Sequence, residues 1–387
     1  HVDGGVEPNP YGNLAVLLED DNLEEVMYNG GAQCVKVAHR DHGMCRTNVW
    51  VDDQQGLEIA KNIAAFTSVP LGDGPGMVPI FDGRLPDGSR VNGTIPPVSP
   101  DGPTLTIRKF REDPLTMIDL IKFGTVNVRL AAMMWVWIEG LDSRPANFVI
   151  AGGTGSGKTT TLNCLGMYIP WHKRLLTVED TAELQVYHDH WLRMETRRER
   201  PDGTPEVDMN DCLKSSLRMR PDRIIVGEVR SSEAATLLTA MNTGHDGSFG
   251  SLHANTAMET ITRMINPPMN VPPIMLTGLD LIIIQARLYI DGKTARKITE
   301  VAEVAGMEGD KPRLNAIWKF NAATGQIEET GIPSKMRETI CTAAGITPAQ
   351  FEQHVKQREQ ILADLLNRDI RDIETVTKVI QGFYATR

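Results

Sequence analysis

The chain has 387 residues, of which 41% are apolar and 23% charged, and its 40 Lys and Arg against 50 Asp and Glu give a net charge of −10. This length suggests roughly two or three domains with a core large enough to need no disulfide scaffold, and the composition excludes a disordered chain. The longest apolar run, Leu130 to Ile138, is too short to span a bilayer, so we expect no integral membrane protein. The acidic balance also argues against a general nucleic-acid binder.

The five cysteines are spread widely along the chain, and no two of them form a Cys-x-x-Cys pair. Free thiols in a reducing cytoplasm therefore explain them better than a zinc site or disulfides. Residues 1–13 are polar and rich in Gly and Pro, and they lack the charged and apolar regions of a signal peptide. Because the chain starts at His1 rather than Met, we expect further N-terminal residues, among them a docking segment.

A small α+β domain is predicted for residues 1–112. Thr104 to Lys109 alternates polar and apolar residues, as a strand with one buried face does. Leu85 to Ser89 contains a Pro-Asp-Gly turn between two short runs, and Val91 to Thr94 is also turn-like. Longer helical patterns follow, so we place a linker at residues 113–117.

Residues 118–387 are predicted to form an α/β domain that ends in a helical subdomain, at about residues 333–387. A capping box at Thr347 to Gln350, with Pro at the first helical position, opens a long helix there. Asp291-Gly292 lies between two strand-like runs and predicts a hairpin. Buried parallel strands are predicted for three short apolar runs: Phe148–Ala151, Arg174–Val178 and Arg223–Val226.

A glycine-rich segment between the first of these strands and a predicted helix matches G-x-x-x-x-G-K-[ST], the pattern of a phosphate-binding loop. Glycines let the backbone wrap around phosphates, and the N–H groups of the loop and the helix N-terminus point at the anion. Lys158 should reach the β- and γ-phosphates, and the Thr159 hydroxyl should bind Mg²⁺. The predicted nucleotide-binding residues are Gly152, Gly153, Thr154, Gly155, Ser156, Gly157, Lys158, Thr159 and, for the α-phosphate, Thr160.

Carboxylates follow two of the predicted strands. Glu179 and Asp180 end one strand, and Glu228 follows another; in open parallel sheets, ligands bind beyond the carboxyl ends of the strands. Carboxylates beside a triphosphate would repel it without a metal, whereas with Mg²⁺ they supply a metal shell and a base that activates water. We therefore predict that Glu179 is catalytic, and that Glu228 is catalytic and binds the metal with Thr159, reaching it through water. The alternative is that these are ordinary acids at strand ends.

Two histidines lie eight residues apart in segments of small residues, His245 in TGHDGS and His253 in SLHAN. A histidine can donate a hydrogen bond to a γ-phosphate and so sense its loss. We therefore predict both as catalytic-site residues; the alternative is two ordinary surface histidines.

Eight arginines fall between Arg193 and Arg230, a basic concentration in an acidic chain. Arginine suits bidentate phosphate contacts and can act on a neighbouring subunit's nucleotide, although about half of the eight are expected to form a salt-bridged face. The candidates for nucleotide contact are Arg193, Arg197 and Arg218, with Arg84, Arg90 and Arg108 from the N-terminal domain.

Four segments occur in fixed order: Gly152–Thr159, Thr177–Leu184, Leu217–Arg230 and residues 243–256. Together they resemble the Walker A, acidic box, Walker B and His box of the type II/type IV secretion ATPase superfamily. Arg84–Asn92 resembles the N-terminal domain of that family. Met264–Pro272 and the C-terminal helices are most similar to the archaeal branch, which includes the archaellum motor ATPase.

The resemblance implies a homohexamer with a RecA-like P-loop ATPase core, a smaller α+β N-terminal domain and C-terminal helices, working on ATP with Mg²⁺. Glu179 would then be the general base, Glu228 would hold Mg²⁺ or its water, and His253 would sense the γ-phosphate. It also implies a cytoplasmic motor, peripherally bound at the inner face of the cell membrane. Through a platform membrane protein it would power an archaellum, a pilus or type II-like secretion, without nucleic acid as a partner. A nucleic-acid-translocating P-loop motor and a non-hydrolysing, nucleotide-gated scaffold stay open as alternatives.

Overall fold

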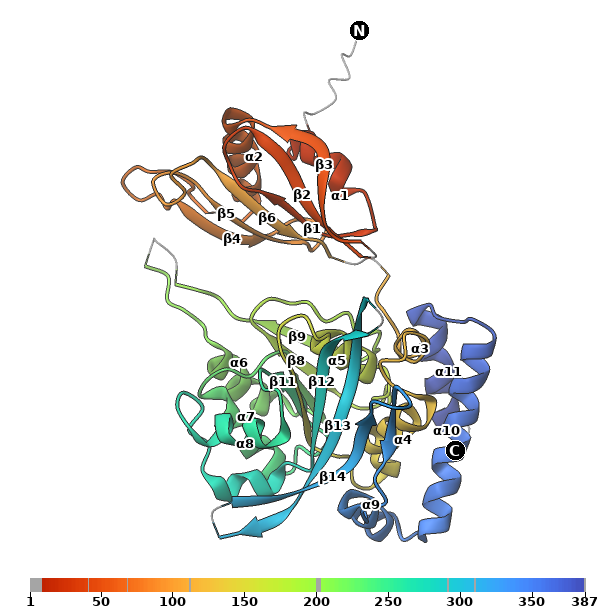
Figure 1. Ribbon diagram of the computed structural model, residues 1–387. Coiled ribbons are helices and arrows are strands. Elements are labelled where there is room, and N and C mark those ends of the chain that lie inside the picture. Colours follow the sequence, from red (N-terminus) through yellow and green to blue (C-terminus); the bar gives the residue numbers. More distant parts are fainter. Residues whose placement is uncertain are drawn as a thin grey trace. The chain divides into compact units, whose positions relative to one another are not determined.

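The computed structural model describes residues 9–40, 42–67, 69–110, 113–199, 203–290, 292–309 and 311–385. The chain forms two compact units (Figure 1), residues 1–112 with 199–205, and residues 113–198 with 206–387. The predicted domain boundary after Glu112 lies outside the described residues. Within the described ranges, every helix is too short or too polar to cross a membrane.

The first unit is a six-stranded antiparallel sheet in the order β3-β2-β1-β6-β5-β4. Helix α2 (Asp53–Phe66) covers one face of it, and Ile59 and Ile63 of this helix share a buried core with strand residues such as Val26 and Ile107. The other elements are a 3-10 turn (Gly12–Leu14), α1 (Ala15–Leu18), β1 (Leu23–Tyr28), β2 (Gln33–His39), β3 (Gly43–Val51), β4 (Ile80–Arg84), β5 (Arg90–Thr94) and β6 (Thr104–Arg108).

The first unit differs from its prediction at two places. The prediction of a turn at Val91–Thr94 is wrong. The segment lies inside strand β5, where Val91 and Gly93 are buried and pair with β6. The prediction also omits helix α2, although Asp52 and Gln55 form a capping box at its start. The Pro-Asp-Gly turn is confirmed, because the Leu85 and Ser89 backbones bond across it between β4 and β5.

The second unit is built on a nine-stranded sheet in the order β15-β14-β13-β12-β7-β11-β10-β8-β9. The strands from β12 to β9 run parallel, and β13, β14 and β15 extend the sheet in antiparallel fashion. The strands are β7 (Phe148–Ala151), β8 (Leu175–Glu179), β9 (Trp191–Glu195), β10 (Arg223–Val226), β11 (Phe249–Leu252), β12 (Leu281–Ile290), β13 (Lys293–Glu308), β14 (Lys311–Asn321) and β15 (Gln326–Glu329).

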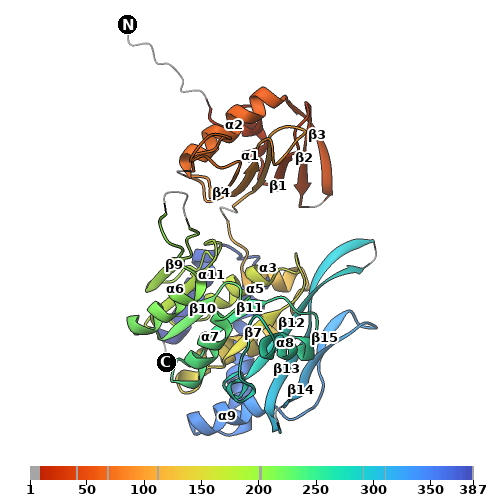
Figure 2. The ribbon, with the colours of Figure 1, turned by 90° about the vertical axis from the view of Figure 1, so that its left-hand side faces the viewer.

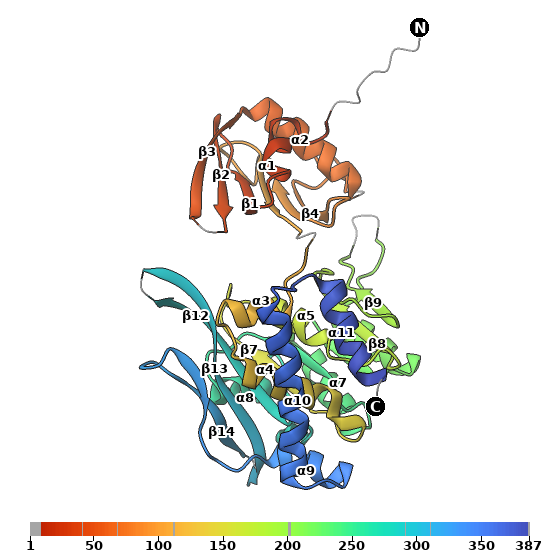
Figure 3. The same cartoon turned by 90° about the vertical axis from the view of Figure 1, so that its right-hand side faces the viewer.

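Helices cover both faces of this sheet (Figures 2 and 3). In β7, Phe148 and Ile150 face a core shared with the C-terminal helices, whereas Val149 and Ala151 face a second core. Burial on both faces explains why these strands are continuous apolar runs. The helices are α3 (Met117–Lys122), α4 (Val128–Glu139), α5 (Lys158–Gly166), α6 (Met209–Ser216), α7 (Glu233–Asn242), α8 (Ala257–Ile265), α9 (Lys335–Ala344), α10 (Pro348–Asn367) and α11 (Ile373–Ala385).

The C-terminal helices are attached through α4. Arg358 of α10 and Glu139 of α4 form an ion pair in which both side chains are fully buried. The Arg358 guanidinium also lies over the rings of Trp135 and Phe383, at 5.5 and 4.8 Å. Trp135 Nε1 donates to the Tyr384 hydroxyl at 2.6 Å. The C-terminal helices, with the predicted capping box that opens α10, therefore pack onto the rest of the second unit.

Candidate nucleotide-binding site

The glycine-rich segment 152–157 connects β7 to α5 at the carboxyl edge of the parallel strands. Gly155 and Gly157 have φ angles of 72° and 91°, a region that other residues rarely enter. Gly152 has no room for a side chain, because a Cβ there would lie 2.1 Å from the Gln285 carbonyl oxygen. The loop therefore needs its glycines to wrap tightly in front of the N-terminus of α5, the shape that binds phosphate.

Lys158, the first residue of α5, is folded back over the loop. Its Nζ donates to the carbonyl oxygens of Gly152 and Gly153 at 2.9 and 3.1 Å. Burial lowers the pKa of the Lys158 ammonium, and the Glu228 carboxylate opposes that shift. A phosphate would offer the ammonium a charged and therefore stronger acceptor than these carbonyls.

Glu179 is the last residue of β8 and is only 2% exposed. Its Oε1 accepts hydrogen bonds from the backbone N–H groups of Glu183 and Leu184 at 2.8 and 2.9 Å, whereas Oε2 is buried without a partner among the described residues. Burial raises the pKa of the Glu179 carboxyl, against the two backbone N–H groups and the charge of Arg193. A fixed carboxylate with one unused oxygen and a raised pKa is suited to act as a general base.

Glu228 follows β10 and has two partners for its carboxylate. Oε2 accepts a hydrogen bond from Arg230 Nη2 at 2.6 Å, and Oε1 lies 2.8 Å from His253 Nε2. Burial on its own would raise the pKa of Glu228, but Arg230, His253 and Lys158 lower it overall. Arg230 also reaches Asp180 at 2.9 Å. One guanidinium thus bridges the acids that follow β8 and β10.

His253 follows β11 and lines a cleft of about 490 Å³ together with Glu228, Arg230 and Arg263. Burial and the charge of Lys158 lower the pKa of the His253 imidazole. This shift favours the neutral form of the ring, which carries a single N–H. This N–H can be donated to an anion in the cleft, as the sequence predicts.

The residues present fit a magnesium–nucleotide complex. The loop offers N–H donors and Lys158 to phosphates, and Thr159 follows directly in the first turn of α5. Glu179 Oε2, which has no partner among the residues that the structure describes, and the ionised Glu228 supply oxygen groups of the kind that Mg²⁺ and its water ligands prefer.

His245 lies at the other edge of the sheet. It precedes β11, whose first residue, Phe249, pairs with Phe148 at the start of β7, whereas His253 and the glycine-rich loop come after these strands. The His245 Nδ1 lies 3.2 Å from the Pro221 carbonyl oxygen. The structure therefore does not bring the two predicted histidines together, and it does not support a phosphate contact of His245 within its own chain.

The arginines between β8 and β10 are spread over the unit. Arg193 on β9 packs over the Trp191 ring at 4.5 Å and is close enough to Glu179 to lower its pKa. Arg197 is exposed just beyond β9, and Arg218 is exposed in a 3-10 turn before β10, at the amino edge of the sheet. Of these three, Arg193 is the one that lies beside the site of its own chain.

Arg84, Arg90 and Arg108 form one row across the sheet of the first unit. Arg90 of β5 pairs directly with Arg84 of β4 and with Arg108 of β6, so the three side chains leave the same face of neighbouring strands. The row ends at Glu25 of β1, which lies opposite Arg108. All three belong to the first unit, and their contact with a nucleotide stays a prediction.

Three residues of the β12–β13 hairpin approach the loop although none of the motifs contains them. Gln285 Nε2 donates to the Ser156 carbonyl oxygen at 2.8 Å, and Arg296 Nε donates to the Gly155 carbonyl oxygen at 3.0 Å. Arg287, directly opposite Arg296, is the third. Gln285 is 129 residues from Ser156, so no local motif could link the two. The sequence signal for this contact is that Gln285 and Arg287 interrupt an otherwise apolar strand.

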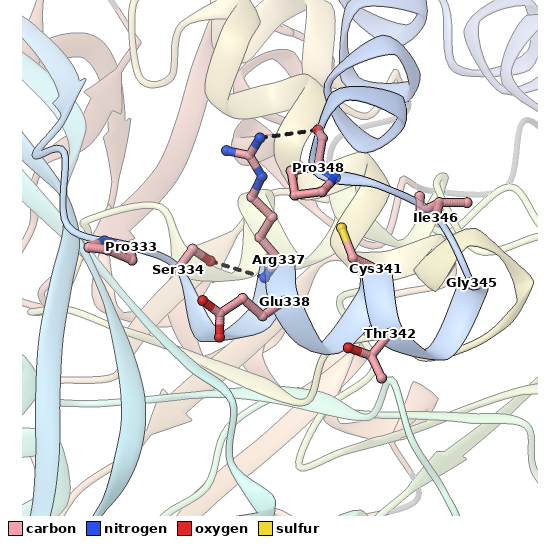
Figure 4. A pocket seen from close by; sticks show the side chains of 9 residues that line it. All are labelled: Pro333, Ser334, Arg337, Glu338, Cys341, Thr342, Gly345, Ile346 and Pro348. Atoms are coloured by element: carbon pink, nitrogen blue, oxygen red, sulfur yellow. Dashed lines mark hydrogen bonds between the residues drawn. The ribbon is translucent and has the colours of Figure 1, made fainter.

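A second, open cleft of about 680 Å³ lies along α9 and the start of α10 (Figure 4). Arg337 Nη2 reaches across it to donate to the Pro348 carbonyl oxygen at 3.2 Å, and the Arg337 N–H donates to Ser334 Oγ at 3.1 Å. Helix α9, which lines it, lies at the opposite end of the unit from α5 (Figure 1). We do not assign it to the nucleotide.

Two solved structures, of an ATPase and of a pilus retraction motor, share this fold. The ATPase DotB of Legionella pneumophila aligns over 95% of this chain and 94% of its own, with a TM-score of 0.51 at 17% identity. The pilus retraction motor PilT, solved with bound ADP, aligns over 89% of this chain and 87% of its own, with a TM-score of 0.50 at 19% identity. The likeness covers the N-terminal antiparallel sheet, the P-loop core and the C-terminal helices.

Sequence comparisons point the same way. Residues 75–378 match the family described as Type II/IV secretion system protein. The uncharacterized protein MJ0781 of Methanocaldococcus jannaschii is 32% identical over 96% of this chain and 75% of its own length. The conjugal transfer protein TrbB of Rhizobium radiobacter is 36% identical over 65% of this chain and 74% of its own length. The chain belongs to the type II/IV secretion system ATPase family.

Proposed function

We propose that this ATPase is a Mg²⁺-dependent hexameric motor that assembles or rotates a type IV pilus-like filament, an archaellum or a pilus, or drives type II-like secretion. The observation that supports this most is the meeting of the phosphate-binding loop, Glu179, Glu228 and His253 at one edge of a sheet. Each of the four lies at the end of a different parallel strand or directly after it, so the strand order itself sets their spacing.

In the proposed reaction, Lys158 exchanges its loop carbonyls for the β- and γ-phosphates of ATP. Magnesium, held by Thr159 and by Glu228 directly or through water, would neutralise charge on the phosphates. The Glu179 Oε2 accepts a proton from the water that attacks the γ-phosphorus, while the bond to the bridging oxygen of ADP breaks. Because burial raises the pKa of Glu179, its carboxylate is a stronger base than an exposed one.

The sensing of the γ-phosphate falls to His253. Its neutral ring can donate the Nε2 hydrogen to Glu228, 2.8 Å away, or to a phosphate, but not to both at once. Loss of the phosphate would leave the ring facing Glu228 Oε1 again. Arg193 would act beside Glu179, while Arg84, Arg90 and Arg108 are proposed for nucleotide contact and Arg197 and Arg218 for contact from a neighbouring subunit.

The work would pass to a platform membrane protein, so the motor would be cytoplasmic and peripherally bound at the inner face of the cell membrane. The relatives' names support a place in filament or secretion machinery, because one is a conjugal transfer protein and another a pilus retraction motor.

Capture of a platform membrane protein from detergent-solubilised membranes tests the proposed partner. Recovery of an archaellum platform rather than a pilus platform would identify the filament. ATP hydrolysis that DNA or RNA stimulates, with a steep salt dependence, would instead favour a nucleic-acid motor. A verified hexamer that binds ATP without turnover would favour the nucleotide-gated scaffold.

A further inference from the structure

The strands β12 and β13 continue beyond the carboxyl edge of the sheet as a hairpin arm (Figures 2 and 3). Ile284 of β12 pairs with Ala151, the last residue of β7, so the residues after Ile284 run beside the loop that follows Ala151. Gln285 and Arg287 share one face of the arm because side chains alternate along a strand. Gln285 contacts the loop, so this face of the arm is turned toward it.

Both arginines of this face approach the loop backbone. Arg296 lies directly opposite Arg287, and its Nε donates to the Gly155 carbonyl oxygen at 3.0 Å. A Cβ built on Gly155 would lie 3.5 Å from Arg287 Nη1, and one built on Gly157 would lie 3.2 Å from Arg296 Cδ. Glycines at these two positions therefore leave room for the arginine side chains against the loop.

The charges of this pair are not compensated within the described residues. Like charges directly opposite each other on an antiparallel pair repel. Neither Arg287 nor Arg296 forms an ion pair there, although acidic residues outnumber basic ones in the chain, 50 to 40. Two neighbouring guanidinium groups beside a phosphate-binding loop are an arrangement that a polyphosphate stabilises, because each can donate charge-assisted hydrogen bonds to its oxygens.

We propose that Arg287 binds a phosphate of the nucleotide held by the loop, and that Arg296 is a positioning residue that ties the arm to Gly155 and so keeps Arg287 within reach. This inference rests on the proposed nucleotide site. It adds to that site a cation from the hairpin arm, which lies outside the four sequence motifs.

The arm also supplies a matched control. Lys293 pairs with Ile290 near the tip of the same hairpin, on the face opposite to that of Arg287. Lys293→Ala removes one positive charge from the arm without altering the face that is turned to the loop.

The test titrates the full chain with a fluorescent ATP analogue and uses inorganic tripolyphosphate as a competitor. Arg287→Ala should weaken the binding of both about tenfold, whereas Lys293→Ala should leave both within about twofold. Arg296→Ala should weaken both, and Arg296→Lys, which keeps a donor for the Gly155 carbonyl, should restore most of the affinity. Without ligand, Arg287→Ala should melt at or above the wild-type temperature, because it relieves a repulsion.

Unchanged affinities in Arg287→Ala would overturn the inference, and so would a lower melting temperature of that variant without ligand. Weaker binding of the ATP analogue with unchanged tripolyphosphate binding would also overturn it, because the guanidinium would then contact the base or sugar. Lys158→Ala separates this inference from the proposed function. If Lys158→Ala binds the ATP analogue as tightly as the wild type, the nucleotide site itself is refuted. If Lys158→Ala loses binding but Arg287→Ala keeps the wild-type affinity, only the role of the arm is refuted.

Discussion

Arg230 holds Glu228 through a contact of 2.6 Å between Nη2 and Oε2. The same guanidinium reaches Asp180 at 2.9 Å, so the acids that follow two separate strands share one cation. Because Glu228 is the proposed magnesium ligand, Arg230 keeps its carboxylate ionised and in a fixed place.

Replacing Arg230 by Gln should move the acid limb of ATP hydrolysis to higher pH. Burial raises the pKa of Glu228, and Arg230 is the main group that lowers it again. Without the guanidinium, Glu228 should therefore protonate at a higher pH and lose its hold on the metal. A pH profile of kcat/KM measures the shift. Arg263→Gln, which removes a cation from the same cleft, should leave the limb in place; an equal shift in both variants would contradict the assignment.

Glu179→Gln should stabilise the fold near neutral pH. Burial raises the folded-state pKa of Glu179 above its unfolded value, so this group favours folding at low pH and loses that contribution as pH rises through the folded pKa. Gln does not titrate. The free energy of unfolding of the variant should therefore exceed the wild-type value at neutral pH, and the difference should vanish below the unfolded pKa of about 4.3. Denaturant unfolding at several pH values tests this, and a difference independent of pH would refute the cause.

Arg358→Met should lower the free energy of unfolding by about 3–5 kcal/mol, because it removes the cation that pairs with the fully buried Glu139 carboxylate. The double variant with Glu139→Met should recover most of the loss, since apolar side chains can fill the site. Arg368→Met breaks an exposed pair with Asp364 and should cost less than about 1 kcal/mol. Denaturant unfolding measures all three, and a double variant as unstable as Arg358→Met would show that the lost packing matters more than the charge.

His253→Ala should lower kcat by about 10²-fold, because it removes a hydrogen-bond donor beside the γ-phosphate. His245→Ala should leave kcat near the wild-type value, since this histidine lies at the opposite edge of the sheet. Steady-state hydrolysis of both variants makes the comparison. Equal losses would mean that His245 reaches the nucleotide of a neighbouring subunit.

The strands that carry the site could be predicted because they are buried on both faces. Phe148–Ala151 is a continuous apolar run that coincides with β7, and the apolar residues 224–226 make up β10 after its first residue, Arg223. The phosphate-binding loop is equally local, since its glycines and Lys158 are contiguous in the sequence.

Other features depend on packing that local patterns do not contain. His245 and His253 are only eight residues apart, but strand β11, at about 3.3 Å per residue, carries them to opposite edges of the sheet. Gln285 and Arg287 meet the loop only because β12 pairs with β7 and runs past its end. To predict either feature, one must know which strands pair and how many residues each strand extends beyond its neighbour.

Hydrolysis by Glu179→Gln most directly decides whether this edge of the sheet is the ATPase centre. The variant should bind Mg-ATP with near wild-type affinity and hydrolyse it roughly 10²- to 10⁴-fold more slowly, because no base takes the proton of the attacking water. Lys158→Ala should lose binding, and Glu183→Gln, which keeps the backbone N–H that donates to Glu179, should hydrolyse ATP far faster than Glu179→Gln. Normal hydrolysis by Glu179→Gln would contradict the assignment of Glu179 as the base.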